Sequence, residues 1–210
     1  MAQQRGACLV IACGALAREI TALRAANGWE GLAVQCLPAD LHNRPERIPA
    51  AVSAAIAAAR PRYQRIFVAY GDCGTGGRLD AVLAREGVER LPGAHCYEFY
   101  AGPQTFAALS EAEPGTFYVT DFLARHFERL VIAGLGIARH PELAAVYFGN
   151  YRRLVYLAQT TEPTARAGLR EQARQAALRL GLEFSEHTTG YGALQVRLAR
   201  FSEERMAWPS

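Results

Sequence analysis

Short apolar runs that end in polar or glycine-bearing turns constrain the fold of this chain more than any other feature. Residues 7–13, 32–37 and 65–70 each read as a buried strand, and each is followed by a segment with helical spacing of apolar residues. Strands that alternate with helices favour a mostly parallel sheet with helices on both faces. The sequence therefore predicts an α/β protein of the Rossmann-like or flavodoxin-like kind.

The same alternation continues through the second half of the chain. Helices are expected at residues 15–27, 48–59, 80–85, 106–111, 122–132, 141–152 and 163–180, and further strands at residues 94–98, 154–158, 182–187 and 193–198. The last two of these strands would form a pair. The pattern is compatible with a single α/β domain over residues 1–210 or with two pseudo-related lobes divided near residue 114.

Composition excludes several classes of function. The 210 residues are half hydrophobic, which is enough for a sizeable core. All 23 basic residues are arginine, so lysine Schiff bases and P-loop lysines are excluded. The arginines are spread along the predicted helices and the net charge is only +3, so we expect no nucleic-acid partner. No apolar run approaches the roughly 20 residues that span a bilayer, so we expect a cytoplasmic protein without a membrane partner.

Three cysteines occupy corresponding positions. Cys13, Cys73 and Cys96 each lie at or just beyond the end of a predicted strand. If the strand order is 2-1-3-4, the three strands are neighbours about 5 Å apart, and the thiols line one edge of the sheet. The order 3-2-1-4 would displace Cys73. Cys8 and Cys36 lie inside strands, and we expect both in the core.

These thiols have three interpretations. As soft ligands, Cys13, Cys73 and Cys96 would bind a metal with a nitrogen from His95 or His42, zinc being the first choice and an iron–sulfur cluster the second. Alternatively, Cys73 would be a catalytic thiol near a helix N-terminus. The third interpretation is that small, apolar-like cysteines simply pack the strand ends.

Other side chains near these thiols are candidates for supporting roles. Asp72 would position a partner of Cys73, and Gly74 would allow the backbone to approach a bound cofactor closely. Glu98 shares strand parity with Cys96, so it is a candidate base or carboxylate ligand. His42, in the polar loop at residues 38–45, is either a site residue or a surface residue.

The second half of the chain offers weaker candidates. The aromatic segment at residues 147–153, which includes Tyr151, would stack a planar cofactor, form an oligomer contact or pack a helix on the sheet. Asp121 and Arg125 have the spacing of a helix-face ion pair, and His126 is a minor candidate. The turns at residues 159–161 and 188–192 would bind a polar ligand or serve as plain turns.

Taken together, six short motifs resemble the bacterial and archaeal family known as domain of unknown function 1638, and they are spread over nearly the whole chain. They are Cys13-Gly14-Ala15-Leu16, Leu41-His42-Asn43-Arg44-Pro45, Tyr70-Gly71-Asp72-Cys73-Gly74, His95-Cys96-Tyr97-Glu98, Thr120-Asp121-Phe122-Leu123 and Tyr147-Phe148-Gly149-Asn150-Tyr151. The family name supplies no established reaction. The resemblance implies a setting of corrinoid-dependent methyl transfer, with a corrinoid or a corrinoid protein as partner. That setting fits a thiolate-bound metal, because corrinoid methyltransferases commonly use zinc to activate a thiol.

These observations lead to one leading expectation of function and two alternatives. The leading expectation is a metal-binding protein with a cysteine site at strand ends, acting as an enzyme or accessory factor in one-carbon metabolism. One alternative is a metal-free, cysteine-dependent enzyme in the style of racemases and lyases. The other is a non-catalytic carrier of a metal or tetrapyrrole. A small-molecule partner and a homo-oligomer are compatible with all three.

Overall fold

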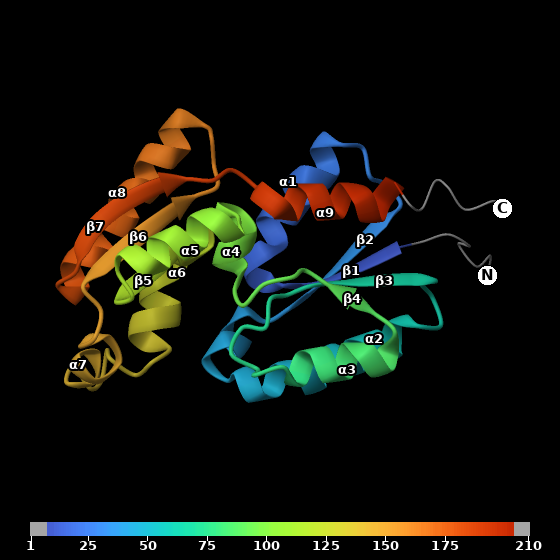
Figure 1. The fold of residues 1–210 in the computed structure, drawn as a ribbon, viewed down its shortest axis with the longest axis horizontal. Helices are drawn as coiled ribbons and strands as arrows, with labels where there is room; N and C mark the ends of the chain where they lie inside the picture. Colours follow the sequence, from blue (N-terminus) through green and yellow to red (C-terminus); the bar gives the residue numbers. More distant parts are fainter. Residues whose placement is uncertain (1–7, 204–210) are drawn as a thin grey trace. The chain divides into compact units, whose positions relative to one another are not determined.

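A computed structural model describes residues 8–203 of the chain. The chain forms two compact units (Figure 1). The first unit contains the residues up to Cys96 and those from Ala193 onward, and the second contains Tyr97–Gly192. The boundaries therefore lie elsewhere than the division near residue 114 that the sequence allowed, because the C-terminal segment returns to the first unit. Within the described residues, no helix combines the length and apolar character needed to cross a membrane.

The first unit is built on a parallel sheet with the strand order β2-β1-β3-β4. This confirms the order 2-1-3 over 3-2-1 for the first three strands, and the fourth place is taken by Glu89–Arg90 instead of the strand predicted at residues 94–98. Helices α1 and α9 cover one face of the sheet and α2 and α3 the other (Figure 1). The strands are β1 (Cys8–Cys13), β2 (Leu32–Leu37), β3 (Arg65–Ala69) and β4 (Glu89–Arg90), and the helices are α1 (Ala17–Ala26), α2 (Ile48–Ala59), α3 (Arg78–Glu86) and α9 (Gly192–Glu203).

Short 3₁₀ helices shape the carboxyl edge of this sheet. They are η1 (Gly14–Leu16), which follows β1, and η2 (Ala39–Asn43) with η3 (Pro45–Arg47), which connect β2 to α2. The central strand β1 is buried along its whole length, as expected for a strand covered on both faces. Cys8, 1% exposed, is in the core as predicted. Cys36 is exposed, so its prediction as a core residue was wrong, and the reason is that β2 is an edge strand.

The second unit contains a parallel sheet with the order β5-β6-β7. One face of it packs with α6 and α8 residues through Val119, Leu154 and Tyr156, and the other packs Val155 and Leu157 against α4 and α5 residues. The elements are β5 (Thr116–Thr120), β6 (Arg153–Ala158), β7 (Glu183–Thr188), α4 (Cys96–Ala101), α5 (Pro103–Ala112), α6 (Asp121–Phe127), the π-helical segment η4 (Glu128–Ala133), α7 (Leu143–Phe148) and α8 (Pro163–Leu180).

Two predicted strands are helical in the structure. Residues 94–98 were expected to form a strand, but β4 ends at Arg90 and Cys96 begins α4. Pro92 has no N–H for a sheet ladder and Gly93 has a φ of 111°, so the chain leaves the sheet before Cys96. Residues 193–198 were also expected to be a strand and instead lie in α9, whose buried residues recur at helical spacing.

Candidate functional site

Cys13 and His42 are brought together by the pairing of β1 with β2. Cys13 pairs with Leu37 at the carboxyl end of both strands, and His42 follows in η2. The Cys13 Sγ lies 3.6 Å from His42 Nδ1 and accepts the N–H of Ala15 at 3.3 Å. His42 Nδ1 also lies 3.2 Å from the carbonyl oxygen of Ala39. Backbone groups on both sides therefore hold the thiol and the imidazole in contact.

Burial keeps both members of this pair neutral. It raises the pKa of the Cys13 thiol to about 12, and it lowers the pKa of His42 from its ordinary value. A thiolate–imidazolium pair would need shifts in the opposite directions. At neutral pH the pair is therefore a thiol beside an uncharged imidazole.

Tyr70 lies directly after β3 and faces the same pair. Ala12 pairs with Ala69, so Tyr70 and Cys13 are the next residues on adjacent strands. The Tyr70 ring stacks on His42, with 6.3 Å between ring centroids and 10° between planes. Its buried hydroxyl lies beside the Cys13 thiol, and this contact falls outside strict hydrogen-bond geometry but partly offsets the effect of burial on the thiol pKa. The hydroxyl therefore faces a thiol, which is a weak acceptor.

Cys73 lies in the turn after Tyr70 with a backbone φ of 51°, which is unusual for a residue other than glycine. Its N–H donates to the carbonyl of Ala94 at 2.7 Å, and its sulfur receives the N–H groups of Gly71 and Cys96. Burial nevertheless raises the pKa of Cys73 to about 11. A negative charge on Cys73 would also raise the pKa of Cys13, so the two thiols are electrostatic neighbours.

Asp72 and Gly74 form the turn that holds Cys73. The Asp72 carboxylate accepts the hydroxyl of Thr75 at 2.5 Å and the N–H groups of Gly76 and Gly77. Desolvation opposes ionisation, but these hydrogen bonds hold the pKa of Asp72 below its ordinary value. Gly74 has a φ of 84°, and a Cβ there would lie 3.5 Å from Pro45. The turn is thus packed against the loop that carries His42.

The segment after β4 passes close to the Cys73 turn. A Cβ on Gly71 would lie 3.1 Å from the backbone of His95, so glycine permits this approach. His95 is exposed, and its positive charge would lower the pKa of His42. Cys96 is half-buried at the start of α4. The strand parity that was expected to pair Glu98 with Cys96 is absent, because both residues are helical.

The site residues that the sequence predicted are distributed over both units. Glu98 and Tyr151 belong to the second unit, where the Tyr151 ring lies 5.8 Å from Phe117 and 5.7 Å from Phe148. Cys13, His42, Asp72, Cys73, Gly74, His95 and Cys96 belong to the first unit. Among residues 8–203, no three His, Cys, Asp or Glu side chains are arranged to hold one metal ion.

Arg90 was not singled out by sequence, yet it fixes the segment next to Cys73. Its guanidinium donates to Asp80 at 2.6 Å and 2.9 Å, and to the carbonyls of Leu91 at 2.6 Å and Gly93 at 3.1 Å. The Gly93 carbonyl also accepts the N–H of Asp72. Arg90 therefore connects α3 to the Cys73 turn. An arginine inside a short strand signal gives no sequence clue to such a role.

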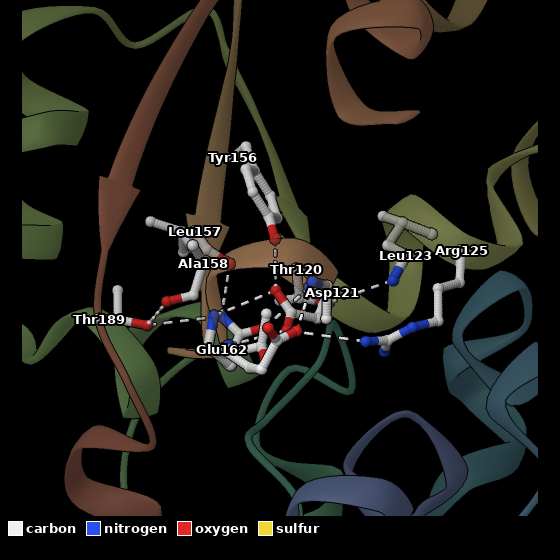
Figure 2. Close-up of polar contacts among 12 residues, drawn as sticks. Thr120, Asp121, Leu123, Arg125, Tyr156, Leu157, Ala158, Glu162 and Thr189 are labelled. Atoms are coloured by element: carbon white, nitrogen blue, oxygen red, sulfur yellow. Dashed lines mark hydrogen bonds and ion pairs between the residues drawn. The ribbon is translucent and has the colours of Figure 1, made fainter. Parts of the chain in front are cut away.

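A second polar cluster lies at the carboxyl ends of the strands of the second unit (Figure 2). Asp121, 2% exposed, accepts the Tyr156 hydroxyl at 2.7 Å and the N–H groups of Gln159 and Thr160. Its own N–H donates to Gln159 Oε1 at 2.7 Å, and Arg125 lies 3.9 Å from its carboxylate. Of these contacts, the sequence spacing predicted only the ion pair between Asp121 and Arg125. The cluster ties the end of β5 to that of β6.

The polar groups in the turns beside this cluster form hydrogen bonds with other groups of the chain. Gln159 Nε2 donates to the carbonyl of Leu157 at 2.5 Å and lies 3.5 Å from the Thr189 hydroxyl. The Glu162 carboxylate accepts the first N–H groups of α8, from Thr164 and Ala165. His126 packs edge-on against Phe122, with 4.7 Å between ring centroids. These contacts make residues 159–162 and 189 part of the local structure.

The fold and the thiol turn define an α/β protein with a part-buried cysteine–histidine pair at the carboxyl end of strand β1. The model of the family described as Protein of unknown function (DUF1638) matches residues 36–198 of the chain. The chain belongs to this family, as the motifs suggested. The match includes His42, Cys73 and Cys96, and Cys13 lies outside it. No curated protein and no solved structure matches the chain.

Proposed function

We propose that the first unit binds a soft metal ion through Cys13 and His42, with Cys73 moving in as a third ligand, because the described residues hold no preformed set of three His, Cys, Asp or Glu ligands. Zinc is the first choice, because thiolate and imidazole are its usual ligands. The observation that carries the proposal is the approach of the Cys13 thiol to the His42 ring, with 3.6 Å between Sγ and Nδ1 and the Cys73 thiol as an electrostatic neighbour. Because Nδ1 donates to the Ala39 carbonyl, Nε2 would be the nitrogen that binds the metal. The protein would act as an enzyme or as an accessory factor that uses the bound metal.

The electrostatics of the two thiols count against a free nucleophile. A nucleophilic cysteine needs a lowered pKa, whereas burial raises the pKa values of Cys13 and Cys73 to about 12 and about 11. A divalent cation between them would offset both the burial and the mutual repulsion of two thiolates, and binding would release the thiol protons. The neutral imidazole of His42 is already in the protonation state that a metal requires.

A metal-free thiol enzyme is the second candidate, and it has one specific observation in its favour. The Cys73 sulfur receives two backbone N–H groups, an arrangement that stabilises a thiolate. This candidate predicts that Cys73 is alkylated faster than the exposed Cys36 near neutral pH. The metal-binding proposal predicts the reverse order of reactivity in the metal-free protein.

Metal analysis of protein purified anaerobically and without a histidine tag tests the proposal. We expect about one equivalent of zinc per chain; iron with inorganic sulfide would instead indicate the iron–sulfur alternative. Cys13→Ser, His42→Ala and Cys73→Ser should each weaken zinc binding at least tenfold. Cys36→Ser is the matched control, because that thiol lies exposed on the edge strand.

Two outcomes would contradict metal binding at this site. One is a folded wild-type protein that binds no zinc, iron or other soft cation in titration. The other is an equal loss of zinc from Cys36→Ser and Cys73→Ser. The corrinoid-dependent, one-carbon setting implied by the family resemblance stays a prediction, in which such a metal would activate a thiol for methyl transfer.

A further inference from the structure

A cavity of about 250 Å³ opens at the amino edge of the sheet in the first unit. Arg65 and Glu89, the first residues of β3 and β4, line it, and Arg65 pairs with Cys8 at the start of β1. Cys13 lies at the opposite end of β1, so the cavity is separate from the thiol site. Its volume suits a small ligand, because drug-sized molecules occupy pockets of roughly 300–1,000 Å³.

The charged side chains that line this cavity are mostly arginine. They come from the end of α2, from β3, from β4 and from α9, and they are Arg60, Arg65, Glu89, Arg197 and Arg200. Four guanidinium groups against one carboxylate give the lining a net positive charge. The buried rings of Phe67 and Phe201 also line the cavity. Their low polarity strengthens the attraction between such a charge and an anion.

Two of the guanidinium groups are held in place by the fold. The Arg65 guanidinium donates to the Phe201 carbonyl at 3.2 Å and lies 4.6 Å from the centre of the Phe201 ring. Arg60 donates to the Glu86 carbonyl, with 3.9 Å between its Nη2 and the Glu86 carboxylate. Side chains that are already ordered lose less conformational freedom on binding. An anion would therefore meet a partly preorganised site.

The other two arginines lie on α9. Arg197 and Arg200 are three residues apart, so they share one face of the helix. Arg197 lies 3.9 Å from the carboxylate of Glu89, whose side chain is 85% exposed. Exposed ion pairs contribute little free energy, so an anionic ligand can replace Glu89 beside Arg197.

We propose that this cavity binds a small phosphorylated molecule, whose phosphoryl oxygens accept hydrogen bonds from the arginines. The planar N–H fork of a guanidinium group matches phosphate oxygens well. The four arginines come from three elements, and a tetrahedral phosphoryl group offers oxygens in several directions, whereas a carboxylate offers two in one plane. The proposal does not depend on the chemistry of the thiol site.

Isothermal titration calorimetry of the full chain with pyrophosphate tests this assignment, with citrate as the carboxylate arm. We expect pyrophosphate to bind at least tenfold more tightly than citrate, and its affinity to fall as added salt screens the charges. Arg197→Gln/Arg200→Gln should weaken pyrophosphate binding at least tenfold. The matched control is Arg18→Gln/Arg24→Gln, because it removes two exposed arginines of α1 that are not part of the lining.

Glu89→Gln separates ligand binding from a purely structural role of the arginines. Arginines near helix C-termini also offset the negative ends of the helix dipoles. Glu89→Gln removes the carboxylate of the lining, so it should tighten pyrophosphate binding about threefold. A protein that binds no pyrophosphate at low salt, or an equal effect of the two arginine double variants, would overturn the site. Citrate that binds as tightly as pyrophosphate would overturn its assignment to a phosphorylated ligand.

Discussion

Cys13 and Cys36 lie on adjacent strands of one sheet, yet their side chains have opposite surroundings. Cys13 is 3% exposed at the end of the central strand β1, and Cys36 is exposed on the edge strand β2. A thiol at the edge keeps its contact with water, whereas the central thiol exchanges water for an imidazole and a backbone N–H. The position in the sheet therefore decides which cysteine can serve as a buried ligand.

The buried Cys13 thiol should make the stability of the metal-free protein depend on alkaline pH. Its pKa is raised from 9.0 to about 12, so between these values the folded protein binds a proton that the unfolded chain has lost. The contribution of the Cys13 thiol to the free energy of unfolding is complete below pH 9 and is lost as pH rises towards 12. Linkage predicts a loss of about 2 kcal/mol between about pH 8 and pH 10.5.

Urea denaturation of EDTA-treated protein at several pH values measures this dependence. Cys13→Ser removes the titrating thiol, so its stability should fall less steeply with pH than that of the wild type. Cys36→Ser should follow the wild type more closely, although burial also raises the pKa of Cys36. Identical pH profiles for the wild type and Cys13→Ser would contradict a raised thiol pKa at this position.

At the scale of elements, the hydrophobic pattern predicted the strands that helices cover on both faces. It failed where contacts between residues distant in sequence determine the secondary structure. The strands β1, β2, β3 and β6 and the helix α8 were predicted close to their observed bounds. β5 (Thr116–Thr120) was not predicted, because its last residue, Thr120, is also the N-cap of α6 and the local pattern indicated only the helix. Residues 193–198 alternate like a strand locally, but α9 buries Leu194, Leu198 and Phe201 on one helical face.

The position of the candidate site could likewise be predicted only in part. Strand-end positions located Cys13 and Cys73, and the strand order 2-1-3-4 makes their strands neighbours. Cys96 was placed on a strand that does not form, because Pro92 and Gly93 divert the chain. The contact of Tyr70 with Cys13 depends on the register of β1 against β3, which a single sequence does not contain.

The Asp121 cluster is expected to be the main polar stabilising element of the β5–β6 strand ends. The Asp121 carboxylate accepts three hydrogen bonds from the Tyr156 hydroxyl and the N–H groups of Gln159 and Thr160. Asp121→Asn would replace one carboxylate oxygen by an NH₂ group, which would face the N–H of Thr160 or the two donors to Oδ1 and leave buried groups unsatisfied. We expect a loss of about 2–4 kcal/mol in the free energy of unfolding, measured by urea denaturation.

A double-mutant cycle shows whether this loss comes from the cluster itself. Tyr156→Phe alone should cost about 1–2 kcal/mol, and it should cost less when Asp121 is already asparagine. Glu162→Gln is the matched control, because it changes an exposed carboxylate that also caps a helix and should cost about 1 kcal/mol or less. Additive effects of Asp121→Asn and Tyr156→Phe would count against a coupled cluster.

At the scale of the whole molecule, the chain repeats one plan in two units. Each unit has a purely parallel sheet with polar or thiol groups at the carboxyl ends of its strands. The thiol–imidazole pair belongs to the first unit and the Asp121 cluster to the second. A continuous run of α/β segments predicted the class of fold, but not that the last helix returns to the first unit, because no local signal marks that return.

Because α9 belongs to the first unit, we expect a substitution on its buried face to destabilise that unit selectively. The Phe201 ring lies 5.3 Å from that of Phe67 on β3, and the guanidinium of Arg65 lies 4.6 Å above it. Phe201→Ala would leave a cavity there and cost about 3 kcal/mol. Hydrogen-exchange mass spectrometry should then show faster exchange in β1 and β3, with β5 and β6 unchanged.

Phe184→Ala provides the reciprocal test, because Phe184 on β7 packs against the core of the second unit. It should accelerate exchange in β6 and β7 and leave β1 and β3 protected. Each unit has its own sheet and its own buried residues, so local opening should follow the unit that loses the ring. If either substitution accelerated exchange equally in all strands, the two units would open as one cooperative body, and the selective role of α9 would be wrong.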